Sequence, residues 1–186
     1  QRVHPGDRVL LIEASLRCLL TSERTMLNLL GQLSGVATQT ARWADALAGS
    51  RAVIRDTRKT VPGLRTLQKY AVRCGGGQNH RMGLGDAALI KDNHVAAAAI
   101  RAVQSHAPQV ACEVECDTLD QVREAVGAGA HLVLLDNMAP DVMRRAVAIC
   151  RPAGVRTEAS GGLLLADAPA VAPTGVDYVS VGALTH

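Results

Sequence analysis

Aromatic residues are almost absent from this sequence. It contains no Phe, and Trp43, Tyr70 and Tyr178 are the only aromatic side chains among 186 residues. Because proteins hold single-stranded nucleic acids largely by stacking bases on aromatic rings, the chain offers almost no platform for them. The pI near 8.7 is therefore a weak indication of nucleic-acid binding, and we expect no nucleic acid as a partner.

Long apolar runs are missing as well. No stretch approaches the ~20 residues that a membrane-spanning helix needs, and residues 1–15 lack the basic-then-apolar order of a signal peptide. With 48% hydrophobic and 20% charged residues, the composition is typical of a globular protein rather than a disordered one. The sequence predicts a soluble, cytoplasmic protein that has no membrane partner.

The cysteines lack the pattern of a disulfide framework. The five are odd in number and widely scattered, in a chain too large to need disulfide staples. Cys112 and Cys116 flank Glu-Val-Glu, but this spacing without a second Cys or His pair is a poor zinc signature. We predict reduced thiols, with these two as small buried core residues.

Positive charge, in contrast, is concentrated in one part of the chain. The window from Arg51 to His94 carries nine Lys and Arg residues against three Asp and Glu, and the rest carries eleven against fourteen. Apolar runs separate these cations, which is unlike a solvated basic tail. The pattern predicts one basic pocket for an anion, with a multiply charged small molecule as the first candidate.

Short apolar, β-branched runs recur along the chain. From Ala87 onward they start roughly 22 to 24 residues apart, close to one strand, one helix and two turns. The six runs begin near residues 52, 87, 110, 131, 155 and 177. Such alternation predicts a parallel sheet covered by helices, and so short a repeat favours an open α/β barrel of about six strands.

Capping residues mark the helices that we expect between these runs. Thr60 stands before Pro62 in a first-turn pattern, and Thr118 precedes an amphipathic segment. Asn137, ahead of Ala-Pro-Asp, is expected to open another helix.

The region before the first run is expected to be a long helix preceded by a short remnant. Residues 22–48 have helical spacing with one apolar stripe, which is either a core face or a dimer face: Met26, Leu29, Leu30, Leu33 and Ala37. Residues 1–20 contain a turn leading into a short strand. We therefore divide the chain into a remnant of an N-terminal domain, 1–20, and an open-barrel catalytic domain, 21–186.

Polar residues follow the expected strands, at the positions that line the mouth of a barrel. In chain order they are Asp56, Arg58, Lys59, Lys91, Asn93, His94, Glu113, Glu115, Asp136 and Asn137, and then Ser160-Gly161-Gly162 and Gly182-Ala183. The glycine-containing segments could hold a phosphate on backbone N–H groups, although short glycine pairs are also common turns.

Arg58 and Arg81 have two interpretations. A guanidinium donates two parallel hydrogen bonds to a carboxylate or phosphate, which suits substrate recognition. Alternatively, the two could form structural ion pairs with Asp56 and Asp86. The presence of Lys59 and Lys91 in the same group favours recognition of an anion.

Glu115 and Asp136 stand at the ends of neighbouring expected strands, where they could share a Mg²⁺ ion or accept hydrogen bonds from ribose hydroxyls. A carboxylate in a basic mouth could instead only balance charge. His80 and His94 could bind substrate or transfer protons, or serve as structural donors. Neither histidine has the Ser or Cys partner of a nucleophilic triad.

Seven strings occur here in a fixed order: D-T-R-K-T-x-P-G-L-R, G-G-G-x-N-H-R-x-G-L-G-D, L-I-K-D-N-H, E-V-E, L-L-D-N, E-A-S-G-G and V-G-A-L-T-H. They resemble quinolinate phosphoribosyltransferase, the carboxylating nicotinate-nucleotide pyrophosphorylase. The likeness runs from L-L-T-x-E-R-T-M-L-N to the last residue. The resemblance implies an open α/β barrel with an N-terminal sandwich domain, in a homodimer whose subunits share their sites.

The resemblance also implies residue roles. Quinolinate would be held by Arg58, His80, Arg81 and Lys91, with Arg24 reaching in from a partner subunit. Phosphoribosyl pyrophosphate and Mg²⁺ would be bound by Lys59, Glu115 and Asp136, with backbone at Ser160, Gly161, Gly182 and Ala183 around the 5-phosphate. Of these, Lys59, Lys91, Glu115 and Asp136 would be catalytic. The implied reaction joins the pyridine nitrogen to the ribose and releases pyrophosphate and CO2, giving nicotinate mononucleotide for NAD biosynthesis.

Three departures from the family pattern accompany the resemblance. Most of the N-terminal domain is not among these residues, the segment from Asn93 to Val103 is short, and relatives continue beyond the last residues. We expect reduced stability and an incomplete site from these differences. Two alternatives stay open: a non-catalytic fragment that dimerises or binds anions, and a paralogue associated with molybdenum transport, which the full basic set disfavours.

Overall fold

The sheet of this protein contains six parallel strands, as the sequence predicts. The computed structural model describes residues 2–91 and 96–186. The strands are β1 Val53–Arg55, β2 Ala87–Ile90, β3 Ala111–Cys116, β4 Leu132–Asp136, β5 Arg156–Ser160 and β6 Tyr178–Ser180. Their order across the sheet is β1-β6-β5-β4-β3-β2, and every ladder is parallel.

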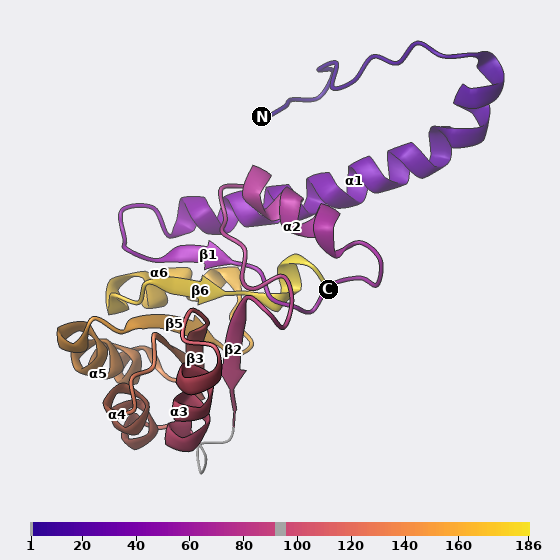
Figure 1. The fold of residues 1–186 in the computed structure, drawn as a ribbon. Coiled ribbons are helices and arrows are strands. Elements are labelled where there is room, and N and C mark those ends of the chain that lie inside the picture. The colour runs from indigo at the N-terminus through magenta and orange to yellow at the C-terminus, as the bar shows by residue number, and fades with distance from the viewer. Residues whose placement is uncertain (1, 92–95) are drawn as a thin grey trace.

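The sheet is an open barrel because its two edge strands do not form a ladder. Among the described residues, β1 forms one isolated bridge outside the ladders, which joins Arg55 to Gln78 in the segment before β2. Helices cover the outer face of the curved sheet (Figure 1). They are α1 Leu16–Ala46, α2 Arg65–Cys74, α3 Ala96–His106, α4 Leu119–Gly127, α5 Pro140–Cys150 and α6 Ala168–Val171. Among the residues that the structure describes, no helix is long and apolar enough to cross a bilayer.

Successive side chains of each strand point alternately toward the helices and into the barrel. On β3 and β4, Val114, Cys116, Val133 and Leu135 face the helices and are fully buried in the hydrophobic core. The residues between them point into the barrel. Cys112 and Cys150 are also buried, so Cys112 and Cys116 are core residues, as expected. Burial raises the pKa of the Cys116 thiol to about 12, which keeps it protonated and unreactive.

Helix α1 spans two different settings. Its C-terminal half buries Val36, Thr40 and Trp43 against the barrel, whereas its N-terminal half projects away from it (Figure 1). Of the predicted apolar stripe, Leu33 and Ala37 pack on the core. Leu30, on the projecting half, is exposed. The core-face interpretation is therefore confirmed for the C-terminal half of α1, whereas the dimer face stays a prediction for the projecting half.

Three local predictions need correction. Helix α2 begins at Arg65 rather than near Thr60, because Gly63 has a φ of 78°, which a right-handed helix cannot contain. Asn137 does not cap α5; it has a φ of 50°, and Ala139 is the N-cap. No strand forms before α1; after a turn at Pro5 and Gly6, the described arm is irregular.

Candidate active site

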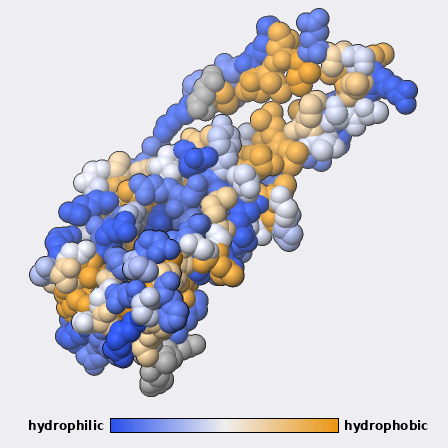
Figure 2. Space-filling model, viewed as in Figure 1, coloured by the Kyte–Doolittle hydropathy of each residue, from blue (hydrophilic) through white to orange (hydrophobic). Residues whose placement is uncertain are grey.

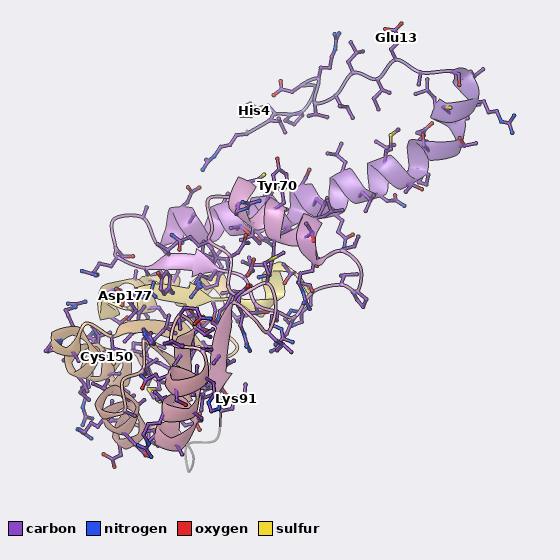
Figure 3. The ribbon with its side chains drawn as sticks, viewed as in Figure 1. His4, Glu13, Tyr70, Lys91, Cys150 and Asp177 are labelled. Carbon is purple, nitrogen blue, oxygen red and sulfur yellow. The ribbon has the colours of Figure 1, made fainter. Side chains whose placement is uncertain are left out.

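The carboxyl ends of the strands surround a cavity of about 690 Å³. Eleven of the twelve predicted site residues line it: Arg58, Lys59, His80, Arg81, Lys91, Glu115, Asp136, Ser160, Gly161, Gly182 and Ala183. Figure 3 shows Lys91 immediately beyond the end of β2. The twelfth residue, Arg24, is exposed on the projecting half of α1 and does not line this cavity. Asn93 and His94 lie outside the described residues.

The loop after β1 is fixed by its own hydrogen bonds. The Arg65 guanidinium donates to the Arg58 carbonyl at 3.2 Å and to Thr60 Oγ1 at 3.0 Å. Thr185 Oγ1 donates to the Lys59 carbonyl at 2.7 Å. These contacts leave the side chains of Arg58 and Lys59 directed at the cavity, where both are lining residues.

Arg58 and Arg81 are not engaged by the aspartates considered from the sequence. Asp86 accepts from the backbone N–H groups of Met82 and Gly83, at 2.7 and 3.1 Å. Arg81 Nη1 donates to the Ala87 carbonyl at 3.1 Å. Burial and then the nearby Arg58 charge lower the pKa of Arg81, whereas Glu113 raises it. A bound dianion would relieve this repulsion between guanidinium groups.

Asp56 does not lie at the mouth, contrary to the sequence prediction. It is fully buried and accepts hydrogen bonds from the Lys69 ammonium, from Asn79 Nδ2 at 2.6 Å and from the His80 N–H at 2.8 Å. Lys69 Nζ also donates to the His80 carbonyl at 2.9 Å. The buried Asp56–Lys69 pair thus holds the backbone of His80 from both sides.

The acidic side of the cavity comes from β3 and β4. Glu115 pairs with Lys91 at 2.7 Å, and Asp136 accepts from Asn137 Nδ2 at 2.7 Å. Across residues 2–91 and 96–186, no group of three His, Cys, Asp or Glu could hold a metal ion. Two carboxylates still suit Mg²⁺, which usually keeps several waters and takes its other ligands from substrate phosphates.

The backbone segments after β5 and β6 approach their neighbours closely. A Cβ on Gly161 would lie 2.3 Å from Asn137 Oδ1, and one on Gly182 would lie 2.3 Å from the His186 ring. A side chain at Gly161 would also meet the Asn137 backbone nitrogen at 2.6 Å, whereas one at Gly182 would require the His186 ring to move, so the backbone forms this wall of the cavity.

Sequence reasoning did not select Glu158, which is fully buried and also lines the cavity. It precedes Ser160 by two residues on β5 and so shares its inward face. Alternation within the strand could have identified it. Glu158 accepts a hydrogen bond from Arg55 Nη1 at 2.7 Å. Burial raises the pKa of Glu158, an effect that the Arg55 charge opposes.

The chain matches the family described as quinolinate phosphoribosyl transferase, C-terminal domain, over residues 36–186. It is 54% identical to the nicotinate-nucleotide pyrophosphorylase [carboxylating] of Mycobacterium leprae, covering 100% of this chain and 68% of the relative. It is 47% identical to a probable enzyme of the same name from Bacillus subtilis, covering 99% of this chain and 65% of the relative. The chain therefore spans about two thirds of the length of these relatives.

Solved structures agree in fold. The crystal structure of NadC from Streptococcus pyogenes matches with a TM-score of 0.92 and 42% identity, over 100% of this chain and 67% of that one. The nicotinate-nucleotide pyrophosphorylase from Francisella tularensis matches with a TM-score of 0.87 and 44% identity, over 91% and 62%. With its open α/β barrel of six parallel strands, this chain belongs to the quinolinate phosphoribosyl transferase family.

Proposed function

We propose that this chain catalyses phosphoribosyl transfer from phosphoribosyl pyrophosphate to quinolinate with decarboxylation, the step that gives nicotinate mononucleotide in NAD biosynthesis. The observation that carries the proposal is the convergence of two guanidiniums and two lysines with two carboxylates in one cavity at the strand ends. The printed names of the relatives describe the same activity.

The cationic wall suits a pyridine dicarboxylate. Arg58 and Arg81 would each hold a planar carboxylate through paired N–H donors, with Lys91 as a nearby point charge. His80 lines the same cavity, and its Nδ1 accepts a hydrogen bond from the Arg81 N–H at 2.9 Å. Holding the dianion in one orientation would direct the pyridine nitrogen at the sugar.

The opposite side suits the sugar phosphate. Lys59 would neutralise the pyrophosphate, and the glycine-lined backbone at Ser160, Gly161, Gly182 and Ala183 would surround the 5-phosphate. Glu115 and Asp136 would accept from the ribose hydroxyls and hold Mg²⁺. The ion, when bound with the diphosphate, supplies positive charge for the departing group.

The reaction then needs no covalent enzyme intermediate. The pyridine nitrogen attacks the anomeric carbon as the bond to pyrophosphate breaks, and the bonding electrons leave with the pyrophosphate. Carboxylates beside the sugar would stabilise its oxocarbenium-like charge. The 2-carboxylate leaves as CO2, and the ring carbon that it leaves takes up a proton.

The test is an assay for nicotinate mononucleotide and CO2 with the full chain, both substrates and Mg²⁺. We expect product in the unmodified protein, and a loss of about 100-fold or more in kcat/KM for Arg81→Ala. Arg123→Ala is the matched control, because Arg123 is exposed and pairs with Asp120 on α4. Quinolinate binding by calorimetry without product would support the non-catalytic alternative instead.

A further inference from the structure

An inward-facing acidic side chain lies beneath the cationic wall and has no part in the proposed chemistry. Glu158 is fully buried on β5 and is one of the residues that line the cavity. Burying a carboxylate is costly unless it is paired, so its retention here calls for a physical reason. Its partners supply that reason.

One oxygen of Glu158 is anchored and the other is directed at His80. Arg55 Nη1 donates to Oε2 at 2.7 Å. The Arg55 guanidinium lies 4.4 Å from the centre of the Tyr178 ring and also donates to the Asn79 carbonyl at 3.4 Å. Glu158 Oε1 has no hydrogen-bond partner among the described residues, and it faces His80 Nε2 at 3.5 Å.

The contacts of His80 define which ring nitrogen carries the proton. Nδ1 accepts from the Arg81 N–H at 2.9 Å, so it must be unprotonated. The proton of the neutral ring then sits on Nε2, which faces Glu158 Oε1 and, at 3.4 Å, Glu113 Oε2. Burial, followed by the Arg55, Lys69 and Arg81 charges, lowers the pKa of His80 to about 3, consistent with a neutral ring.

The backbone of His80 is held by hydrogen bonds, so its imidazole ring is the part of the residue that can still turn. The His80 N–H and carbonyl are already held by Asp56 and Lys69. These backbone contacts do not fix the orientation of the His80 ring. The hydrogen bond from the Arg81 N–H to Nδ1 depends on that orientation. A carboxylate at Nε2 favours the orientation that keeps Nδ1 toward Arg81.

We infer that Glu158, anchored by Arg55, is a positioning residue that fixes the tautomer and orientation of His80 and so holds Arg81 toward the carboxylates of the acceptor substrate. The inference rests on the proposed function for the identity of that substrate. Because Glu158 acts through His80, its removal is expected to weaken the binding of quinolinate and to leave the binding of phosphoribosyl pyrophosphate almost unchanged.

The kinetic test uses Glu158→Gln, which keeps the side-chain length and removes the charge. We expect the KM for quinolinate to rise about tenfold, while the KM for phosphoribosyl pyrophosphate stays within about twofold. Asp120→Asn is the matched control: Asp120 is exposed, pairs with Arg123 at 2.6 Å within α4, and is not among the residues that line the cavity. An equal rise in both KM values, or none, would overturn the inference.

A second measurement does not depend on activity. Long-range proton–nitrogen NMR spectra report the tautomer of each histidine ring, and the His80 signals are those missing from His80→Gln. We expect the unmodified chain to show His80 protonated at Nε2, and Glu158→Ala to show a substantial population protonated at Nδ1. An unchanged tautomer in a folded Glu158→Ala chain would refute the positioning role, whereas absence of product from the unmodified chain would refute only the proposed function.

Discussion

Gly161 shows how a single residue shapes the cavity. Its φ of 97° is unfavourable for any residue with a side chain, and a Cβ would also lie 2.6 Å from the Asn137 backbone nitrogen. Asn137 itself has a φ of 50° and donates its N–H to the Ser160 carbonyl at 3.0 Å. The loops after β4 and β5 are therefore locked together by a contact that tolerates no extra atom.

Gly161→Ala should consequently cost about 2–4 kcal/mol of unfolding free energy, from backbone strain and displacement of the Asn137 loop together. It should also raise the KM for phosphoribosyl pyrophosphate. Gly154→Ala is the matched control, because Gly154 has a φ of 70° but open space around its Cβ position. For Gly154→Ala we expect a loss of about 1 kcal/mol in the free energy of unfolding, measured in urea. Equal losses in the two variants would show that the close approach of Gly161 to Asn137 does not add to the cost.

Individual residues also show the limits of sequence prediction. The cavity-lining positions of Arg58, Lys91, Glu115 and Asp136 could be predicted, because the carboxyl end of a parallel strand fixes where the next residues lie. Asp56 belongs to the same pattern but is buried with Lys69, thirteen positions away, and no periodicity reports such a pair. Pairing of charges depends on packing between elements, which the spacing of residues does not encode.

Helix α4 begins at a complete capping box, which makes it the clearest element to test. Thr118 Oγ1 accepts from the Gln121 N–H at 3.3 Å, and Gln121 Oε1 accepts from the Thr118 N–H at 2.9 Å. The helix then buries Val122 and Ala125 completely against the core. Because α4 packs on the hydrophobic core, loss of its cap should lower the stability of the whole fold.

We expect Thr118→Ala to lower the free energy of unfolding by about 1 kcal/mol. Ser15→Ala removes the N-cap of α1, where Ser15 Oγ accepts from the Cys18 N–H at 3.4 Å. That end of α1 is exposed, so its fraying should leave the global transition almost unchanged. Chemical denaturation followed by circular dichroism would measure both; a larger loss for Ser15→Ala would show that the projecting half is part of the core unit.

At the element level, the strands could be predicted more closely than the helix ends. Each of the six predicted runs overlaps the strand that forms there, because a buried parallel strand needs a short continuous apolar stretch. The start of α2 differs because Gly63 and the Gln68 side chain, which accepts from the Val61 N–H at 2.9 Å, end the preceding loop. Side-chain contacts of this kind become visible only when the loop is folded.

For the whole molecule, the projecting half of α1 and the arm before it are the least packed part. Figure 2 shows apolar surface along both, and the apolar residues Leu10, Ile12, Met26, Leu27 and Leu30 line a groove between them. Arg24 stands in this region, exposed and away from the cavity of its own chain. We propose that a second copy packs here and that Arg24 enters the cavity of that copy.

Arg24→Ala and Arg81→Ala should each be inactive alone, because each removes one cation from every cavity. Mixed heterodimers contain one cavity with both arginines, so co-expression should restore up to about a quarter of the activity of the unmodified protein, if copies pair at random. Light scattering would establish that both variants form dimers. Failure to complement in confirmed mixed dimers would rule out sharing of Arg24 between subunits.

The order of the strands has a consequence for how the protein is made. Val53 of β1 pairs with Tyr178 of β6, so the first strand to leave the ribosome finds its ladder partner only after β6 has been synthesised. Until then, the consecutive β2–β5 segment can assemble through neighbouring strands, while β1 waits. Arg55 meets Glu158 and Tyr178 through the same late closure. The cationic side of the cavity can therefore be completed only once residues 178–180 are available to pair with β1, and a nascent chain that ends before residue 178 would lack this ladder.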